Sequence, residues 1–199
     1  RRDFRAQRRF ALLTGAEIKR YFPALTAVEV YDTIGSTNTR AVELARAGTP
    51  GVALVLSDSQ SCGRGRVSRP FYSPPGTGIY LTLLTRPRVA PDLLPRLTPL
   101  AAVATAEAIV AIADVKWVND LWIGEKKITG ILTEGALRAD GTPDYAVIGI
   151  GINVGPMTFP GDIAAVATSV ANETGAAPDR DGLTLAVIDR LLTRLAAFP

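Results

Sequence analysis

The 199-residue chain contains no histidine and a single cysteine, Cys62. Without histidine, the Ser-His-Asp and Cys-His arrangements of nucleophilic hydrolases cannot be built, and one cysteine cannot close an internal disulfide. Zinc sites depend on cysteine and histidine ligands, so we expect no transition-metal centre. Any chemistry of this protein must therefore use lysine, arginine, carboxylates, amides and backbone groups.

Two common nucleotide-binding motifs are also missing. The chain has no G-x-x-x-x-G-K-[ST] segment. Gly149, Gly151 and Gly155 form G-x-G-x-x-x-G after an apolar run, one residue off the dinucleotide fingerprint, and no helical pattern follows before Pro156. If the protein uses ATP, it does so without a P-loop or a Rossmann fold.

Long apolar segments are scarce as well. The longest, residues 97–113, carries Glu107 and predicts a buried helix, not a membrane span. The basic N-terminus is not followed by the apolar region of a signal peptide, so we expect a cytoplasmic protein.

The composition fits one domain of ordinary size. With 47% hydrophobic residues, the chain can bury roughly 70% of its unfolded surface. We divide it into a basic segment, residues 1–11, and a domain over residues 12–199. The net charge of +3 is concentrated in the basic segment, which we interpret as a solvated linker, so we expect no specific DNA binding.

Periodicity and turn residues predict the elements of this domain. Ser36 or Thr37 can cap a helix that ends near Ala47. Further helices are expected at 97–113 and 183–197, and strands at 52–56, 79–84, 115–117, 121–123, 128–134 and 145–150. Short turns between successive strands favour antiparallel pairing over β-α-β winding. Trp117 and Trp122 are expected in the core.

The segment most suggestive of function is the arginine loop, residues 60–72 with the sequence QSCGRGRVSRPFY. Its glycines allow the backbone to approach a ligand closely, and its arginines offer permanently charged, forked donors for carboxylate or phosphate. Taken alone, such a loop also fits a solvated turn.

Three more segments agree with the ligand-binding interpretation: GSTN at 35–38, KWVNDLWIGEKKITGILTE at 116–134 and YAVIGIGINV at 145–154. With the arginine loop, their order and spacing resemble the biotin protein ligase family, also called biotin–acetyl-CoA-carboxylase ligases. The resemblance runs from about Leu12 to the C-terminus. It implies an α/β (α+β) domain with a mixed, mainly antiparallel sheet and packed helices, related to class II aminoacyl-tRNA synthetases.

The resemblance implies a two-step reaction. The carboxylate of biotin attacks the α-phosphorus of ATP to give biotinyl-5′-AMP and pyrophosphate, and a lysine of a biotin carboxyl carrier protein then takes the biotin. Both nucleophiles belong to substrates, which suits a chain without histidine. The enzyme must position two anions and neutralise the charge that develops between them.

Site residues follow from the same resemblance. The implied catalytic residues are Lys127, Arg66 and Asp120. The implied biotin contacts are Ser36, Thr37, Asn38, Gln60, Gly63, Arg64, Gly65, Arg66, Lys127, Gly149 and Gly151. The implied ATP and adenylate contacts are Arg64, Arg66, Phe71, Asn119, Asp120, Lys127 and Asn153. Asp120 is also the candidate Mg²⁺ ligand, although Asn119 and Asp120 fit a plain turn equally well on local grounds.

The chain departs from the family pattern at several points. Val118 replaces the proline of KWPND, Ser68 replaces a loop glycine, and Pro70 follows Arg69. We expect neither the N-terminal helix-turn-helix nor the small C-terminal β domain of some members, and either a monomer or a homodimer. Two alternatives stay open: attachment of lipoate or octanoate, and a non-catalytic sensor of biotin or biotinyl-AMP.

Overall fold

The computed structural model describes residues 13–109 and 113–198. A seven-stranded sheet with the order β1-β2-β3-β7-β6-β5-β4 forms its centre. The strands are β1 (Leu25–Ile34), β2 (Val52–Gln60), β3 (Gly78–Thr85), β4 (Asp114–Lys116), β5 (Asp120–Ile123), β6 (Lys126–Leu137) and β7 (Pro143–Asn153). β1 pairs with β2 in parallel, and every other pairing between these seven strands is antiparallel, which confirms the predicted fold class.

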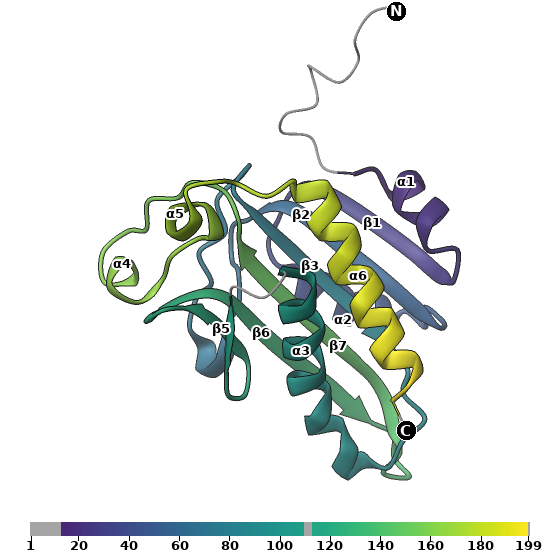
Figure 1. Ribbon diagram of the computed structural model, residues 1–199. Helices are drawn as coiled ribbons and strands as arrows, with labels where there is room; N and C mark the ends of the chain where they lie inside the picture. Colours follow the sequence, from purple (N-terminus) through teal and green to yellow (C-terminus); the bar gives the residue numbers. More distant parts are fainter. Residues whose placement is uncertain (1–12, 110–112, 199) are drawn as a thin grey trace, which may run out of the picture.

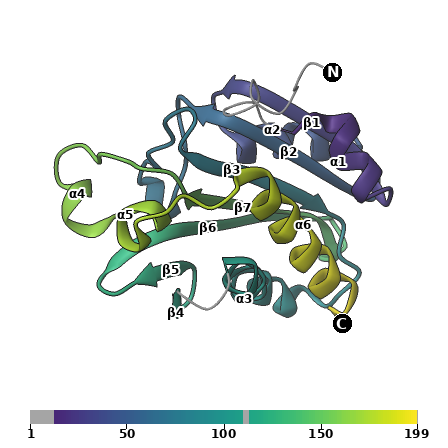
Figure 2. The same ribbon diagram turned by 45° about the horizontal axis from the view of Figure 1, so that its top comes forward.

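Helices cover both faces of this sheet, as Figure 1 and Figure 2 show. α3 and α6 lie side by side on one face, and α2 lies on the other. The helices are α1 (Gly15–Tyr21), α2 (Thr37–Arg46), α3 (Leu97–Ile109), α4 (Ile163–Val166), α5 (Val170–Thr174) and α6 (Arg180–Ala196), with the short 3₁₀ turns η1 (Arg66–Ser68) and η2 (Pro91–Arg96).

The two sheet faces differ in chemistry because side chains alternate along each strand. On β3, Leu81 and Leu83 belong to the main core against α3 and α6. Thr82, between them, points to the face of α2 and is fully buried there. Its partner on β7 is Gly149, which adds no side chain to that face. This second face therefore combines small and polar residues, and the candidate site lies on it.

α2 begins close to this face, and Ser36 caps its first turn. The Ser36 side chain accepts a hydrogen bond from the backbone N–H of Thr39, and the Ser36 backbone is extended. Ala41, Leu44 and Ala45 then pack on β2, β3 and β7. The predicted cap and helix are confirmed, and packing of the apolar stripe fixes where the first turn of α2 points.

Several predictions from sequence were incomplete or wrong. α1 and β1 were not predicted, although Thr14 and Glu17 form a capping box at the start of α1. Trp117 was expected in the core, but its exposed fraction is 79%, because it lies in the turn after the short edge strand β4. α3 is described only to Ile109, and residues 110–112 of the predicted helix lie outside the described residues.

The predicted basic segment, residues 1–11, also lies outside the described residues. Within the described part of the chain, none of the helices has both the length and the hydropathy needed to cross a membrane.

Candidate active site

A buried polar network starts at the N-terminus of α2. Gln60 Oε1 accepts hydrogen bonds from the Thr37 backbone N–H at 2.9 Å and from the Thr37 hydroxyl at 3.1 Å. The Thr82 hydroxyl lies 2.8 Å from both Thr37 Oγ1 and Asn38 Oδ1. Asn38 Nδ2 donates to the Leu132 carbonyl at 3.2 Å. Three strands and a helix thus hold these polar groups in fixed positions.

Glycines on β6 and β7 make room for side chains that lie flat on the sheet. A Cβ atom on Gly149 would lie 1.8 Å from Asn38 Oδ1, and one on Gly151 would lie 2.4 Å from the Phe71 ring. Gly130 is the cross-strand partner of Gly151, and a Cβ there would lie 2.9 Å from the same ring. Phe71 therefore rests on a bare patch of sheet formed by Gly130 and Gly151.

The arginine loop folds back on itself above this patch. Phe71 N–H donates to the Gly63 carbonyl at 2.8 Å, and Gly65 N–H donates to the Arg69 carbonyl at 2.7 Å. A Cβ on Gly63 would lie 2.3 Å from the Phe71 carbonyl oxygen, so only glycine permits this close approach. Val67, at the tip, has φ 54° and is 89% exposed.

Three cations around the patch have partners within the protein. Arg64 pairs with Glu134 at 2.8 Å, and Arg66 Nη1 donates to Asn119 Oδ1 at 3.0 Å. Lys127 Nζ lies 2.7 Å from Asp120 Oδ1. These partners are partly exposed, so an anionic ligand can compete for the cations at modest cost.

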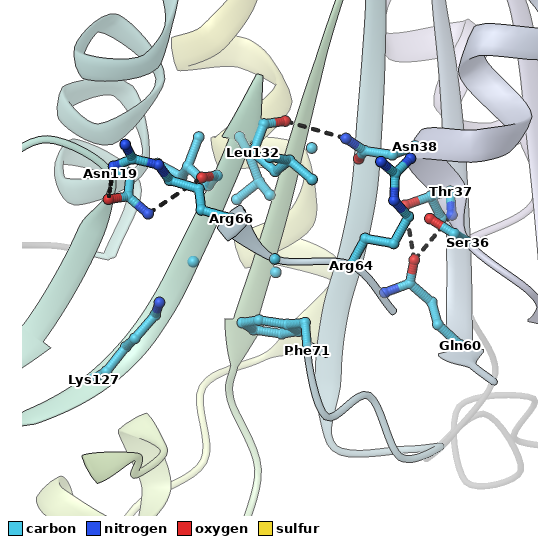
Figure 3. Close-up of a pocket in the computed structure, with 16 residues that line it drawn as sticks. Ser36, Thr37, Asn38, Gln60, Arg64, Arg66, Phe71, Asn119, Lys127 and Leu132 are labelled. Atoms are coloured by element: carbon cyan, nitrogen blue, oxygen red, sulfur yellow. Dashed lines mark hydrogen bonds between the residues drawn. The ribbon is translucent and has the colours of Figure 1, made fainter. Parts of the chain in front are cut away.

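The cations and the polar network surround one space. Figure 3 shows Lys127 and Asn119 on one side, Thr37 and Gln60 on the other, and Phe71 between them. Residues far apart in the sequence meet here because β6 and β7 lie at the centre of the sheet, between β5 and β3.

Two cavities meet at this point. The smaller has a volume of about 40 Å³ and is lined by the polar network, the glycines and the arginine loop. The larger, of about 620 Å³, opens beyond Phe71 toward β5 and the 159–167 segment. Both are lined by Gly65, Arg66, Phe71, Asn119 and Lys127.

Two buried polar atoms beside the larger cavity have no hydrogen-bond partner among the described residues. They are Asn153 Oδ1 and Trp122 Nε1, and both residues line the cavity. Buried polar groups in native proteins are almost always paired, so an unpaired acceptor and an unpaired donor in one cavity wall point to a ligand. Asn153 is held in place by the bond that its Nδ2 donates to the Thr168 carbonyl at 2.9 Å.

Tyr80 supports the patch from the side of β3. Its ring meets Phe71 edge to face with centroids 6.4 Å apart, and its hydroxyl donates to the Pro74 carbonyl at 3.1 Å. Burial raises the pKa of Tyr80 to about 12. The hydroxyl therefore remains a hydrogen-bond donor, and it anchors Pro74, two residues beyond the arginine loop.

The carboxylates near the site are sparse. The described residues contain no group of three or more aspartate, glutamate, cysteine or histidine side chains able to hold a metal ion. Asp120 is the carboxylate that pairs with Lys127, and it also accepts a hydrogen bond from Asn119 Nδ2 at 2.7 Å. A magnesium ion here would need further oxygens from a ligand, as Mg²⁺ bound to nucleotide phosphates commonly has.

The structure brings together nearly all the residues that the sequence predicted for the site. The residues implied for biotin, ATP and catalysis line one or both cavities, with the exception of Gly63. Gly63 lies in the arginine loop and lines a separate surface pocket together with Cys62. Gly149 and Gly151 were predicted to contact biotin. In the structure, the space above these two glycines is filled by the side chains of Asn38 and Phe71.

Sequence reasoning missed other residues of the site. Thr82 and Gly130 appear only when strand pairing is known, because their neighbours are distant in sequence. Trp122 was expected in the core, whereas it is partly buried and lines the larger cavity. Phe159 also lines this cavity, and its ring contacts Tyr72 with centroids 6.2 Å apart.

Known proteins resemble this chain over most of its length. Residues 30–153 match the Biotin/lipoate A/B protein ligase family. The bifunctional ligase/repressor BirA of Bacillus spizizenii is 42% identical over 158 residues, 76% of this chain and 48% of that protein. The biotin–[acetyl-CoA-carboxylase] ligase of Paracoccus denitrificans is 36% identical over 153 residues, 72% of this chain and 62% of that protein.

Solved structures show the same fold. A biotin protein ligase from Aquifex aeolicus, solved in complex with biotin and ATP, superposes with a TM-score of 0.68 at 28% identity. The match covers 87% of this chain and 72% of that one. Against the BirA relatives, the chain spans about half of their length.

Fold and site together define a protein in which two cavities share a cluster of cations on the α2 face of the sheet. The match over residues 30–153 makes the class specific: the chain belongs to the Biotin/lipoate A/B protein ligase family.

Proposed function

We propose that this protein is an ATP-dependent biotin protein ligase, which forms biotinyl-5′-AMP and transfers biotin to a lysine of a biotin carboxyl carrier protein. The observation that carries the proposal is the junction of the two cavities, where Arg66 and Lys127 line both. A carboxylate held in one cavity and an α-phosphate held in the other would meet at these two cations. Family membership and the named relatives support the same chemistry.

In the first step, a carboxylate oxygen of biotin forms a bond to the α-phosphorus of ATP, and the bond from that phosphorus to the bridging oxygen of pyrophosphate breaks. Negative charge accumulates on the phosphoryl oxygens as this happens. Lys127 and Arg66 exchange their present partners, Asp120 and Asn119, for those oxygens. The protein needs no nucleophile of its own, in keeping with a chain that has no histidine.

In the second step, the amine of the carrier lysine attacks the acyl carbon, and AMP leaves. Asp120, freed from Lys127, can accept a hydrogen bond from that amine and orient it. Asn119 and Asp120 line the larger cavity, so we assign both to the nucleotide. Lys127 lines both cavities and is assigned to both substrates.

The smaller cavity is assigned to biotin. Ser36, Thr37, Asn38 and Gln60 supply hydroxyl, amide and backbone groups at its far end, which suits a ureido ring that presents both a carbonyl acceptor and N–H donors. Ligand pockets usually measure about 300 to 1,000 Å³. A cavity of about 40 Å³ must therefore widen, and displacement of the arginine loop with Phe71 would open it along the bare patch of Gly130 and Gly151.

The larger cavity is assigned to the nucleotide. Its volume of about 620 Å³ suits a molecule of this size, and Asn153 Oδ1 offers an acceptor for the amino group of adenine. Mg²⁺ would arrive with the triphosphate, with Asp120 as its protein ligand, and would neutralise phosphate charge.

The remaining assignments concern partners and location. We propose an acceptor domain of acetyl-CoA carboxylase or a related carboxylase, a monomer or homodimer, and no specific DNA contact. A reducing, cytoplasmic setting is compatible with the exposed free Cys62.

Calorimetry with biotin, lipoate and octanoate, each with and without ATP, tests the proposal against its alternatives. We expect biotin to bind, and ATP to produce further heat only in its presence. Preference for lipoate or octanoate would favour the other branch of the family. Biotin binding that ATP leaves unchanged would favour a sensor, although a sensor has no need of Arg66 and Lys127 at the junction.

Arg66→Ala is expected to slow adenylation and to release biotinyl-5′-AMP into solution, because Arg66 joins the arginine loop to the junction of both cavities. The measurement is the fraction of adenylate that stays with the protein after rapid gel filtration. Lys126→Ala removes one positive charge near the site from a residue that lines neither cavity, and it serves as the control. An equal leak from both variants would show that net positive charge, not the position of Arg66, retains the adenylate.

A further inference from the structure

Glu134 lies beside the candidate site, although it lines neither of the two cavities assigned to substrates. It follows Leu132 by two residues on β6, so both side chains point to the same face of the sheet. The side chain of Glu134 is 28% exposed. No step of the proposed reaction uses this carboxylate, and it was not among the site residues implied by the sequence.

The Glu134 carboxylate joins two parts of the site that are far apart in sequence. Its Oε1 atom lies 2.8 Å from Arg64 Nη2, and its Oε2 atom accepts a hydrogen bond from Arg64 Nη1 at 3.3 Å. Oε2 also accepts a hydrogen bond from Asn38 Nδ2 at 3.0 Å. Figure 3 shows the Arg64 side chain reaching toward Asn38. One carboxylate thus connects the arginine loop, β6 and the first turn of α2.

The pair of Arg64 and Glu134 lies at the boundary of the smaller cavity. On the outer side is a hollow of about 560 Å³, and its lining includes both members of the pair together with Gly65 and Leu132. Arg64, Gly65 and Leu132 also line the smaller cavity. The ion pair therefore spans the boundary between the smaller cavity and the outer hollow.

Arg64 differs from the two cations at the junction of the cavities. Arg66 and Lys127 line both cavities, whereas Arg64 lines the smaller but not the larger. Arg66 is bonded to a neutral amide, while Arg64 meets a carboxylate with both of its terminal nitrogens. Such a two-point contact fixes direction as well as distance. Arg64 is therefore better placed to hold the arginine loop than to follow a reacting phosphate.

We propose that Glu134 is a positioning residue that latches the arginine loop over bound biotin through Arg64. This inference rests on the proposed function. The latch stays closed while the ligand is bound and opens when biotin enters or leaves. Because Glu134 accepts from Asn38 Nδ2, it also directs Asn38 Oδ1 toward the Thr82 hydroxyl, 2.8 Å away. The sequence implied a direct ligand contact for Arg64, and the latch assigns it a different task.

Glu134→Gln tests the latch, because the amide has nearly the same shape and still offers an oxygen to Asn38 but lacks the charge that pairs with Arg64. We expect biotin to dissociate about 5-fold faster, the upper end for an exposed ion pair. The melting temperature should stay close to that of the unmodified protein. Stopped-flow displacement of bound biotin measures the rate.

Simple competition for Arg64 predicts the opposite sign. If Glu134 only occupied Arg64 until the biotin carboxylate arrived, removing its charge would tighten biotin binding. Slower release from Glu134→Gln, or an unchanged rate, would therefore overturn the proposal. Glu125→Gln is the matched control, since it removes an exposed carboxylate in the turn between β5 and β6 that lines none of the described cavities. Its release rate should not change.

Arg64→Gln separates the latch from a direct ligand contact. It should speed release as much as Glu134→Gln does, and the double variant should be no faster, because both substitutions remove the same pair. Biotin methyl ester has no carboxylate, and its release should be accelerated equally in both single variants. An effect of Arg64→Gln that disappears with the ester would show that Arg64 binds the carboxylate of the ligand, and the latch would be wrong.

Hydrogen exchange without any ligand decides the latch separately from the proposed function. The Gly65 and Phe71 amides donate hydrogen bonds within the arginine loop, and a loosened loop should exchange them faster. We expect faster exchange in Glu134→Gln and Arg64→Gln than in Glu125→Gln. Equal exchange in all three would overturn the latch. Failure of the unmodified protein to bind biotin, together with the expected exchange, would instead contradict the proposed function and leave the link between Glu134 and the loop in place.

Discussion

Replacing Lys127 with alanine is expected to lower the rate of adenylate formation by about 100-fold or more, the usual loss when a donor to developing charge is removed. Lys127 lines both cavities, and its ammonium group pairs with Asp120 at 2.7 Å. Biotin affinity should fall much less, because the polar network at the far end of the smaller cavity is untouched. Single-turnover kinetics and equilibrium binding separate the two effects.

The matched control for this experiment is Lys126→Ala, since Lys126 is an exposed neighbour on the same strand. Its rate should equal that of the unmodified protein. A Lys127→Ala variant that forms adenylate at an unchanged rate would show that Lys127 does not stabilise the charge that develops in this step.

The second large effect is expected from Gly149→Ala. The new Cβ would lie 1.8 Å from Asn38 Oδ1 and 2.7 Å from Asn38 Cγ, so Asn38 must leave its place. The Thr82 hydroxyl then loses one of its two partners, and the Leu132 carbonyl and the Glu134 carboxylate lose the hydrogen bond from Asn38 Nδ2. Overpacking and unpaired polar groups each cost about 1 to 3 kcal/mol, and we expect lower thermal stability together with loss of biotin binding.

Gly155→Ala is the matched control for this substitution. A Cβ on Gly155 would meet nothing closer than the Thr77 backbone at 3.5 Å, an ordinary contact. Its melting temperature and biotin affinity should stay close to those of the unmodified protein. If Gly149→Ala binds biotin normally, the network around Asn38 does not shape the biotin site.

Coupling between Asn38 and Gly149 can be measured directly. The stability losses of Gly149→Ala and Asn38→Ala should not add in the double variant, because both disturb the same contact. Additive losses would show that the two residues act independently.

The fold was predictable where local signals are strong. The cap at Ser36, the apolar stripe of α2 and the turns between short strands gave the right elements and a mainly antiparallel sheet. The α1 and β1 elements escaped prediction even though the capping box of Thr14 and Glu17 was readable. The parallel pairing of β1 with β2 across α2 is a long-range property that alternation along one strand does not encode.

The site was predictable through motifs and less so through contacts. The segments that resemble the biotin protein ligase family predicted Lys127, Arg66 and the polar residues at the start of α2 as site residues. The structure brings these side chains to one cavity. Partners such as Thr82 and Gly130 depend on strand register, which a single sequence leaves open. Trp117 was misassigned because a large apolar residue usually lies inside, whereas this one lies in a turn at the sheet edge.

Biotin-dependent exchange of labelled pyrophosphate into ATP, measured without any acceptor protein, tests the central claim most directly. The reaction requires only that Arg66 and Lys127 bring a carboxylate and an α-phosphate together at the junction of the two cavities. We predict exchange that appears on addition of biotin, stays absent with lipoate or octanoate, and is largely lost in Lys127→Ala. Exchange that is indifferent to biotin, or that appears with lipoate alone, would contradict the account.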